Sequence, residues 1–338
     1  MSISAILEFV LGLVLAIGTL RDVFDTVVVP GESRGLLKAA RRIVFATLPL
    51  WRWSRAGRGG IPTSFAPFAL VASFVLWMLL LIFAFGLMAY AIRDSFDPRL
   101  PSFPQALYVA GSGLVTVGQS DTDASGSARW LLLAAGFCGL AVMTMAVTYL
   151  LEVQGSIAAR DTGILKLSTS SGQPPSALRL LERYAELDCV DQISDVLRVG
   201  RDWCATVMQS HAAHPSLIYF RSKGTGSGWP ATLGALMDLA LIIELLLEAP
   251  QWRGSAVLLR EQGGRMGETL IDLLGLDHGP APPSALEVEA LLSRLAAAGY
   301  ALRDKPDREG FCAQRGRYAG CTSRMAQHLA GDQAPLTP

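Results

Sequence analysis

The sequence predicts an all-α membrane protein with three membrane-crossing helices, one short re-entrant helix and an all-α cytoplasmic domain. Composition is the first reason: the 338 residues are 51% hydrophobic and only 17% charged, whereas soluble domains carry about 25% charged residues. Hydrophobic patterning is the second. Apolar stretches near the bilayer length of about 20 residues lie in the first half, and helical three-to-four spacing follows in the second half.

Charge and cysteine usage exclude several protein classes. Lys and Arg total 29, as do Asp and Glu, so the chain lacks the basic excess of a nucleic-acid-binding domain. The cysteines are odd in number and none is spaced as CxxC, so we expect reduced thiols, with no disulfide framework and no zinc site. They are Cys138, Cys189, Cys204, Cys312 and Cys321. Small buried side chains are the simplest interpretation of them.

Residues 1–30 are expected to form an N-terminal transmembrane helix. The leader carries no Lys or Arg and no A-x-A site follows, which favours an uncleaved helix over a signal peptide. Arg21, Asp22 and Asp25 interrupt its end, so the sequence leaves open whether this helix spans fully. These charges form either a local salt-bridged anchor or a sensor. No ladder of arginines at every third residue is present, so no voltage sensor is predicted.

Residues 31–61 form a basic segment. Arginines and lysines on one face alternate with apolar residues on the other, and Glu32 is the acid between Pro30 and Ile61. Two interpretations remain: an amphipathic helix on an anionic membrane surface, or a solvated basic linker. Either way, the excess of positive charge predicts a cytoplasmic position.

Two further spans are predicted over residues 65–92 and 130–151, neither of which contains a charge. The segment between them carries four aspartates against two arginines until Ala128, so we expect it outside the cell. This places the N-terminus outside and everything after Gln154 in the cytoplasm. The predicted location is therefore the cell membrane, in a multi-pass arrangement.

The external segment contains an uncharged stretch that is too short to span. Residues 103–117 read FPQALYVAGSGLVTV, which suits a re-entrant element rather than a solvated loop. Ser102 is a suitable N-cap and Pro104 suits the first turn, so a helix is expected to about Leu114. The string Thr-Val-Gly-Gln-Ser-Asp follows it, from Thr116.

This arrangement resembles the pore module of the tetrameric potassium channels, in the form of the bacterial channel domain with two transmembrane helices. The family motif TVGYGD reads TVGQSD here. The resemblance covers roughly residues 65–153, within a pore module predicted over residues 62–154. It implies a homotetramer in a lipid bilayer that conducts K⁺, or Na⁺ as well, through main-chain carbonyls. It implies no cofactor, no bound metal besides the permeant ion, and no enzyme activity.

The resemblance assigns a role to each residue of the motif. Thr116 would supply a carbonyl and its hydroxyl at the innermost ion site, and Val117 the next carbonyl. Gly118 would let the backbone turn through angles that other residues resist. The partly negative C-terminal end of the preceding helix would favour cations.

Two motif positions depart from the family. Gln119 replaces an aromatic residue that braces the outer filter, and Ser120 replaces a second glycine. We therefore expect the two inner ion sites to survive and the outer two to widen, which would weaken the preference for potassium. Asp121 is either an external acid that attracts cations or a turn residue. Other positions of interest are Ser112, where some channels carry a carboxylate, and Tyr108 and Val109, where helix aromatics are common.

The third span is expected to line the inner pore, with Glu152 at its cytoplasmic exit. Gly139 lies where the family places a gating hinge, although close helix packing explains a glycine there equally well. Thr144 and Thr148 are one turn apart. They either face the cavity or bond to their own backbone.

The second half is expected to be a linker over residues 155–175, a helical domain of about five helices over residues 176–300, and a flexible tail over residues 301–338. Ser284 should cap the last helix. The apolar run of residues 233–247 contains Asp238 and Glu244, and a charge at the bilayer centre costs at least ~2.5 kcal/mol. We therefore expect a buried helix there rather than a fourth span.

Two motifs in this half carry weak functional signals. Gly224, Gly226 and Gly228 lack a preceding strand, so a flexible connector is expected rather than a nucleotide-binding loop. His211 and His214 would bind a metal or a proton, or have a structural role. The rival function is a membrane-anchored signalling or scaffold protein. A membrane enzyme ranks third because no catalytic constellation is apparent.

Overall fold

The structure is a computed structural model that describes residues 2–28, 65–220, 224–277, 279, 284–329 and 331–338. The chain divides into two compact units. Of the described residues, the first unit holds 2–28 and 65–153, and the second holds those from 154 onward. One helix, α5 (Ser127–Ser171), contributes its first part to the first unit and its last part to the second.

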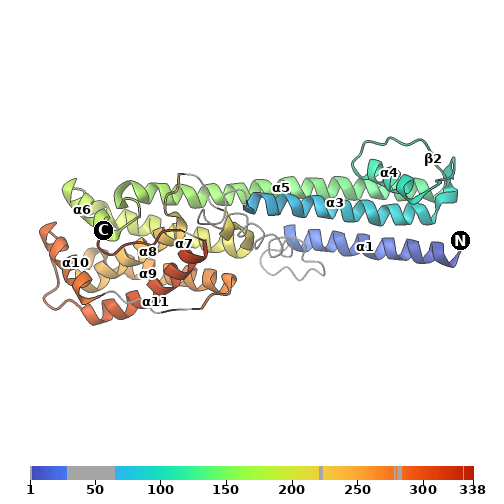
Figure 1. Ribbon diagram of the computed structural model, residues 1–338. Helices are drawn as coiled ribbons and strands as arrows, with labels where there is room; N and C mark the ends of the chain where they lie inside the picture. The colour runs from blue at the N-terminus through green and yellow to red at the C-terminus, as the bar shows by residue number, and fades with distance from the viewer. Residues whose placement is uncertain (1, 29–64, 221–223, 278, 280–283, 330) are drawn as a thin grey trace, which may run out of the picture. The chain divides into compact units, whose positions relative to one another are not determined.

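The first unit is built from helices, as Figure 1 shows. Helix α1 runs over Ile3–Val27, α3 over Phe65–Ala91 and α4 over Phe103–Leu114. After α3 come a short 3-10 turn η1 (Arg93–Ser95) and the strands β1 (Phe96–Asp97) and β2 (Asp123–Ala124), which pair antiparallel. The bonds from the Ser125 amide and hydroxyl to the Ser95 carbonyl, both 2.9 Å, close this end of the unit.

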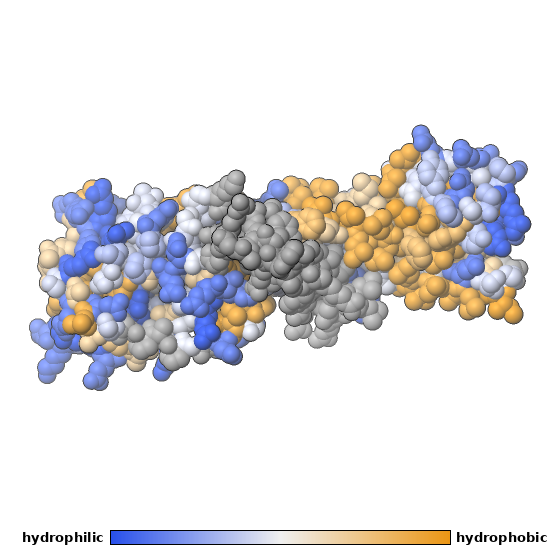
Figure 2. Space-filling view, in the orientation of Figure 1, coloured by the Kyte–Doolittle hydropathy of each residue, from blue (hydrophilic) through white to orange (hydrophobic). Residues whose placement is uncertain are grey.

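The three long helices of the first unit carry apolar side chains on their outer surfaces (Figure 2). Trp130 is 74% exposed and Phe137 73%, which is unfavourable in water for contiguous apolar surface. Length and composition make α1, α3 and α5 each suitable for crossing a membrane. The apolar stretches predicted from the sequence are therefore helices of sufficient length.

Helix α1 packs along α3 through a buried polar contact. Asp22 is fully buried, and the Trp77 indole nitrogen donates to its carboxylate at 2.8 Å. A salt bridge of 3.7 Å joins Arg21 and Asp25 one turn apart on α1. The sequence identified these three charges but not the tryptophan that binds one of them, because the two residues lie 55 positions apart.

The second unit is an all-helical assembly over its described residues. Its α-helices are α6 (Ala177–Glu186), α7 (Ile193–Ala213), α8 (Gly228–Leu241), α9 (Pro250–Leu274), α10 (Ala285–Ala297) and α11 (Arg308–Leu329). Short turns η2 (Val190–Gln192), η3 (Pro215–Tyr219) and the π-helical η4 (Ile242–Leu246) connect them. Helix α8 lies at the centre, and each of its residues from Trp229 to Leu241 is buried.

The run of residues 233–247 is a buried helix of this unit, as predicted. Residues 228–246 are long and apolar enough to span a membrane, but 89% of the relevant window is buried inside the unit. Its acids are paired: Asp238 with Arg315 at 2.7 Å and Glu244 with Arg260 at 2.7 Å. The helix changes to π geometry after Leu241 and ends at Leu246.

The prediction of a linker over residues 155–175 is wrong for most of its length, because α5 continues to Ser171. Hydroxyl groups near its end bond back to helix carbonyls, as Ser171 does to Leu167 at 2.8 Å. The second unit also holds this segment. The Trp203 indole nitrogen donates to the Arg160 carbonyl at 2.9 Å, and Leu167 is buried. These tertiary contacts outweigh the weak helix propensity of serine and threonine.

The flexible tail predicted over residues 301–338 is also wrong, and the helical domain does not end at residue 300. Helix α11 occupies most of that segment, and Phe311 and Met325 are completely buried. Arginines and glycines made this stretch look solvated. The charge of Arg315 is instead satisfied by Asp238 of α8, which lies 77 positions earlier. Among its described residues, the domain therefore contains six α-helices, one more than the five that were predicted.

The structure bears on two local predictions, the Ser284 cap and the free cysteine thiols. Ser284 and Glu287 form a reciprocal capping box at the start of α10. The cysteines of both units are free thiols, but only Cys204 and Cys321 are buried as expected, whereas the other three are half-buried. Burial raises the pKa of Cys204 to about 12 and that of Cys321 to about 11. The basic segment of residues 31–61 lies outside the described residues.

Candidate functional site

Helix α4 and the loop after it form the candidate site. The helix spans Phe103–Leu114 and has Ser102 at its N-cap position, as predicted, although the Ser102 side chain forms no capping bond. Its start is held against α3 by the Phe103 ring, whose centre lies 5.6 Å from that of Phe83 and 5.8 Å from that of Tyr90. The helix is therefore anchored at its N-terminal end by aromatic edge contacts.

The C-terminal end of α4 is held directly against the backbone of α5. A β-carbon placed on Gly139 would lie 1.8 Å from the Leu114 carbonyl oxygen, and one on Gly136 would lie 3.3 Å from that of Gly113. Only a residue without a side chain allows two helix backbones to approach so closely. The sequence indicated Gly139 as a hinge or a packing residue. The structure supports the packing role and adds Gly113, which the sequence analysis did not single out.

The loop after α4 uses its backbone groups unequally. The amides of Val117 and Gly118 both donate to the Ser112 carbonyl, at 2.9 and 3.1 Å, and the Thr116 amide donates to the Gly113 carbonyl at 3.1 Å. Among the described residues, the carbonyls of residues 116–118 accept no hydrogen bond. Three consecutive residues therefore have amides bonded within the chain and exposed carbonyl oxygens that are left for water or another partner.

The backbone of this loop adopts left-handed angles at two positions. Thr116 has φ of 60° and Gly118 has φ of 70°. Glycine adopts this region freely, as predicted for Gly118, but a β-branched residue there is a conformational outlier. Strain of this kind, about 1–3 kcal/mol, concentrates at functional positions. Val117, between them, is 59% exposed in the single chain.

The backbone at Ser120 differs from what a second glycine, as in the TVGYGD motif, would allow. Ser120 does not adopt a positive φ. Its hydroxyl bonds to the carbonyl of Thr122 at 2.8 Å and to its hydroxyl at 3.0 Å. Gln119 and Asp121 are exposed, and Asp121 forms no hydrogen bond or ion pair with any part of the chain that the structure describes. The side-chain hydrogen bonds of this segment are therefore made by Ser120, and Asp121 lies in the bend that follows it.

Behind the loop lies a buried hydroxyl. The Ser112 oxygen is inaccessible to solvent and has no hydrogen-bond partner among the described residues, while its carbonyl holds the loop amides. Val109 is buried, but Tyr108 is 51% exposed. The Ser112 carbonyl therefore joins the end of α4 to the loop.

On α5, both threonines are exposed in the single chain, as is Glu152. The Thr148 hydroxyl donates to the Thr144 carbonyl at 3.0 Å, which is the backbone bond that the sequence analysis weighed against a cavity-facing role. Because this turn is exposed in the single chain, its outer surface could face either a pore cavity or lipid.

The two histidines are both buried. His211 lies in the last turn of α7 and is 1% exposed, and its Nδ1 is 2.9 Å from the Val207 carbonyl. No group of three metal-ligating side chains occurs among the described residues. The glycines at 224, 226 and 228 all have positive φ; the first two lie in the turn before α8, and the third is its first residue.

We expect His211 to make the second unit acid-sensitive. Burial, followed by the charge of Arg160, lowers the pKa of His211 to about 3 from its ordinary value of 6.5. Between these values the unfolded chain binds a proton that the folded chain excludes, so stability falls as the pH falls from about 6.5 toward 3. Thermal unfolding of His211→Gln should show a weaker pH dependence than the wild type over this window. An equal dependence would contradict the assignment.

The comparison with protein families connects this geometry to a function. Residues 77–154 match the model of a family described as ion channel. The match begins at Trp77 within α3 and includes α4, the loop after it and the first part of α5. Searches of curated proteins and of solved structures returned no match. The family match supports an ion channel of the potassium-channel-like type in a membrane protein with several spanning helices.

Proposed function

We propose that this protein is a homotetrameric channel for monovalent cations, with the carbonyls of Thr116, Val117 and Gly118 as its filter. The premise is that residues 77–154 form an ion-channel domain of the potassium-channel-like type. One observation carries the proposal: the amides of these residues are bound by the end of α4, whereas their carbonyls are unoccupied within the described chain. Carbonyl oxygens in this state can replace the water shell of a permeating cation.

The permeating ion would be bound between several copies of the chain rather than within one. One chain contributes one set of three carbonyls, and a ring around an axis requires further copies. The 59% exposure of Val117 and the exposed face of α5 around Phe137 are compatible with burial between subunits. The ends of the α4 helices would add partly negative charge near the ion.

We propose that α1, α3 and the first part of α5 cross the membrane, with the N-terminus outside and the second unit in the cytoplasm. Their exposed apolar surfaces support this (Figure 2). The buried state of α8 within its own unit argues against a fourth span. The basic residues before α3 and the acidic ones after it give the direction.

We further propose that selectivity between K⁺ and Na⁺ is weak. Ser120 bonds to Thr122 and does not adopt a glycine-like φ, and Gln119 is exposed rather than packed. The inner carbonyls would then remain in place while the outer mouth is wider than in a TVGYGD filter. The alternative is a strongly potassium-selective channel.

A bi-ionic reversal potential in liposomes tests the filter. With K⁺ on one side and Na⁺ on the other, we expect a value near zero, since a tenfold preference would move it by about 59 mV. The variant with Gln119→Tyr and Ser120→Gly should move it toward potassium preference by tens of millivolts. Strong potassium preference in the wild type would contradict the widened mouth.

Single-channel recording of Thr116→Ala and Gly118→Ala tests the channel itself. Gly118→Ala places a side chain at φ of 70° and should reduce unitary conductance at least tenfold. Gly126→Ala is the matched control, because Gly126 has φ of 51° and open space around it but lies outside the filter. Absence of any cation current in the wild type would instead favour the rival function, a membrane-anchored signalling or scaffold protein.

A further inference from the structure

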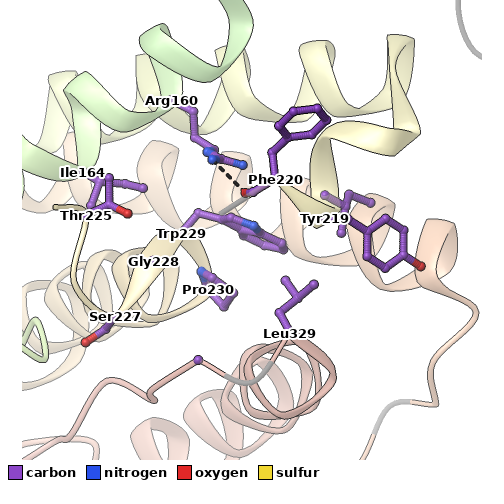
Figure 3. A pocket seen from close by; sticks show the side chains of 12 residues that line it. Arg160, Ile164, Tyr219, Phe220, Thr225, Ser227, Gly228, Trp229, Pro230 and Leu329 are labelled. Carbon is purple, nitrogen blue, oxygen red and sulfur yellow. Dashed lines mark hydrogen bonds between the residues drawn. The ribbon is translucent and has the colours of Figure 1, made fainter. Parts of the chain in front are cut away.

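The second unit contains a pocket that the channel function does not use. It lies between the last part of α5, the turn η3, the start of α8 and the chain that follows α11 (Figure 3). Its interior volume is about 40 Å³, and the pocket is open to solvent. We call it the Arg160 pocket, because the one fully charged side chain that lines it is that of Arg160.

The Arg160 guanidinium is buried and only partly satisfied. The residue is 2% exposed. Its Nε bonds to Asp161 at 3.0 Å, and its two terminal nitrogens bond to the carbonyls of Leu217 at 3.3 Å and Phe220 at 3.0 Å. A guanidinium has five N–H donors, so two have no acceptor among the residues that the structure describes, one on each terminal nitrogen. In Figure 3 the group projects toward the interior of the pocket, above Trp229.

The beginning of α8 faces the same space. Gly228, Trp229 and Pro230 line the pocket, and α8 has no acidic residue in its first turn. The N-cap residue Ser227 does not cap the helix, because its hydroxyl donates to Asp332 at 2.9 Å. The positive end of a helix of 14 residues and a buried guanidinium thus converge on one cavity, which favours an anionic group.

Two carboxylates lie near this space, and both are already engaged. Asp161 pairs with Arg160, and Asp332 accepts from Ser227. The attraction for an anion therefore comes from the two remaining N–H donors and the helix end rather than from net charge. Buried N–H donors without acceptors are costly, so a ligand that supplies two oxygens would relieve this cost.

The remaining walls are mostly apolar, apart from Thr225 and Ser227. They include Ile164, Ile218, Tyr219, Trp229 and Leu329. A planar carboxylate matches the guanidinium fork with two oxygens, whereas a phosphate would bring further charged oxygens against these apolar side chains. An apolar body attached to the carboxylate would cover the aromatic and aliphatic walls.

We propose that the Arg160 pocket binds a small carboxylate with an apolar body, and that it is a cytoplasmic ligand site of this protein. Arg160 lies on α5, the same continuous helix that carries Gly139 and the two threonines of the proposed pore. A ligand that binds Arg160 therefore acts on the pore-lining helix. This regulatory consequence rests on the proposed channel function, whereas the binding site does not.

Thermal unfolding of the purified full-length protein tests binding without any current measurement. The probes are benzoate, its uncharged analogue benzamide, and inorganic phosphate. We expect benzoate to raise the unfolding midpoint by several degrees in a saturable manner, and benzamide and phosphate to have little effect. Arg160→Gln should raise the benzoate concentration that gives half of this shift at least tenfold. Arg198→Gln, on the exposed surface of α7, should respond like the wild type.

A second variant protects the test against misfolding of Arg160→Gln. Leu329→Trp fills the pocket from its half-buried rim and leaves the guanidinium in place, so it should abolish the benzoate response. The proposal would be overturned if folded Leu329→Trp kept the benzoate response or if benzamide gave an equal shift of the wild-type midpoint. It would also be overturned if only phosphate, or no probe at all, shifted that midpoint. Cytoplasmic benzoate should also change open probability in the wild type and not in Leu329→Trp. A wild type without current would defeat the channel while leaving the binding result intact.

Discussion

Gly139→Ala should abolish most of the cation current. The added β-carbon would lie 1.8 Å from the Leu114 carbonyl oxygen and 2.7 Å from its carbonyl carbon. Both contacts are with backbone at the end of α4, so no side-chain rotation relieves them. Overpacking typically costs about 1–3 kcal/mol, and here the displaced backbone is the start of the Thr-Val-Gly loop. We expect at least a tenfold loss of current in liposomes together with an altered reversal potential.

The reversal potential separates this contact from a hinge. A pure gating hinge at Gly139 predicts lower open probability with unchanged unitary conductance and ion preference. The backbone contact predicts that conductance and preference change too, because the loop moves. Gly155→Ala is the control on the same helix, since nothing lies within 4 Å of its added carbon. Wild-type currents in Gly139→Ala would contradict the packing of α4 against α5.

Arg315→Ala should strongly destabilise the second unit. Arg315 Nε donates to Asp238 at 2.7 Å, and the Tyr318 hydroxyl donates to the same carboxylate. Asp238 is 1% exposed within α8. Removing one partner of a buried ion pair costs about 3–5 kcal/mol, because the other charge stays buried. In a domain of this size the loss corresponds to about 6–20 °C in unfolding temperature, measurable by tryptophan fluorescence of the full-length protein.

Two further variants show whether the loss comes from the buried charge. Arg198→Ala removes an arginine whose side chain is 59% exposed and should change stability by less than about 0.5 kcal/mol. Replacing the whole cluster, with Asp238→Leu, Arg315→Met and Tyr318→Phe, removes the charges and the hydroxyl together. This triple variant should recover most of the lost stability. A loss in it as large as that of Arg315→Ala would show that side-chain packing, not charge, holds α11.

Local sequence features predicted the short helix of the candidate site well. Ser102, Pro104 and the uncharged run after them lead to α4 with its observed bounds, Phe103–Leu114. Capping and apolar periodicity depend on neighbouring residues, so they are readable from one chain. The same reasoning failed for the last turns of α5 and for α11, since Trp203, Phe311 and Asp238 stabilise these helices from distant positions.

The site itself divides in the same way. The Thr-Val-Gly string and the need for glycine at residue 118 were evident from the residue types. The contact of Gly139 with Leu114, the bond from Trp77 to Asp22 and the pocket around Arg160 were not.

Taken alone, the order of residues determines which segments of this chain are apolar, where its helices begin and which loop carries the pore-like motif. These properties arise from interactions within a few residues and from transfer of side chains out of water. Tertiary packing decides which backbone atoms meet, which buried charges are paired and which N–H donors of Arg160 remain unused. Such contacts join residues far apart in the chain, and their energies depend on distances of tenths of an ångström that no local pattern encodes.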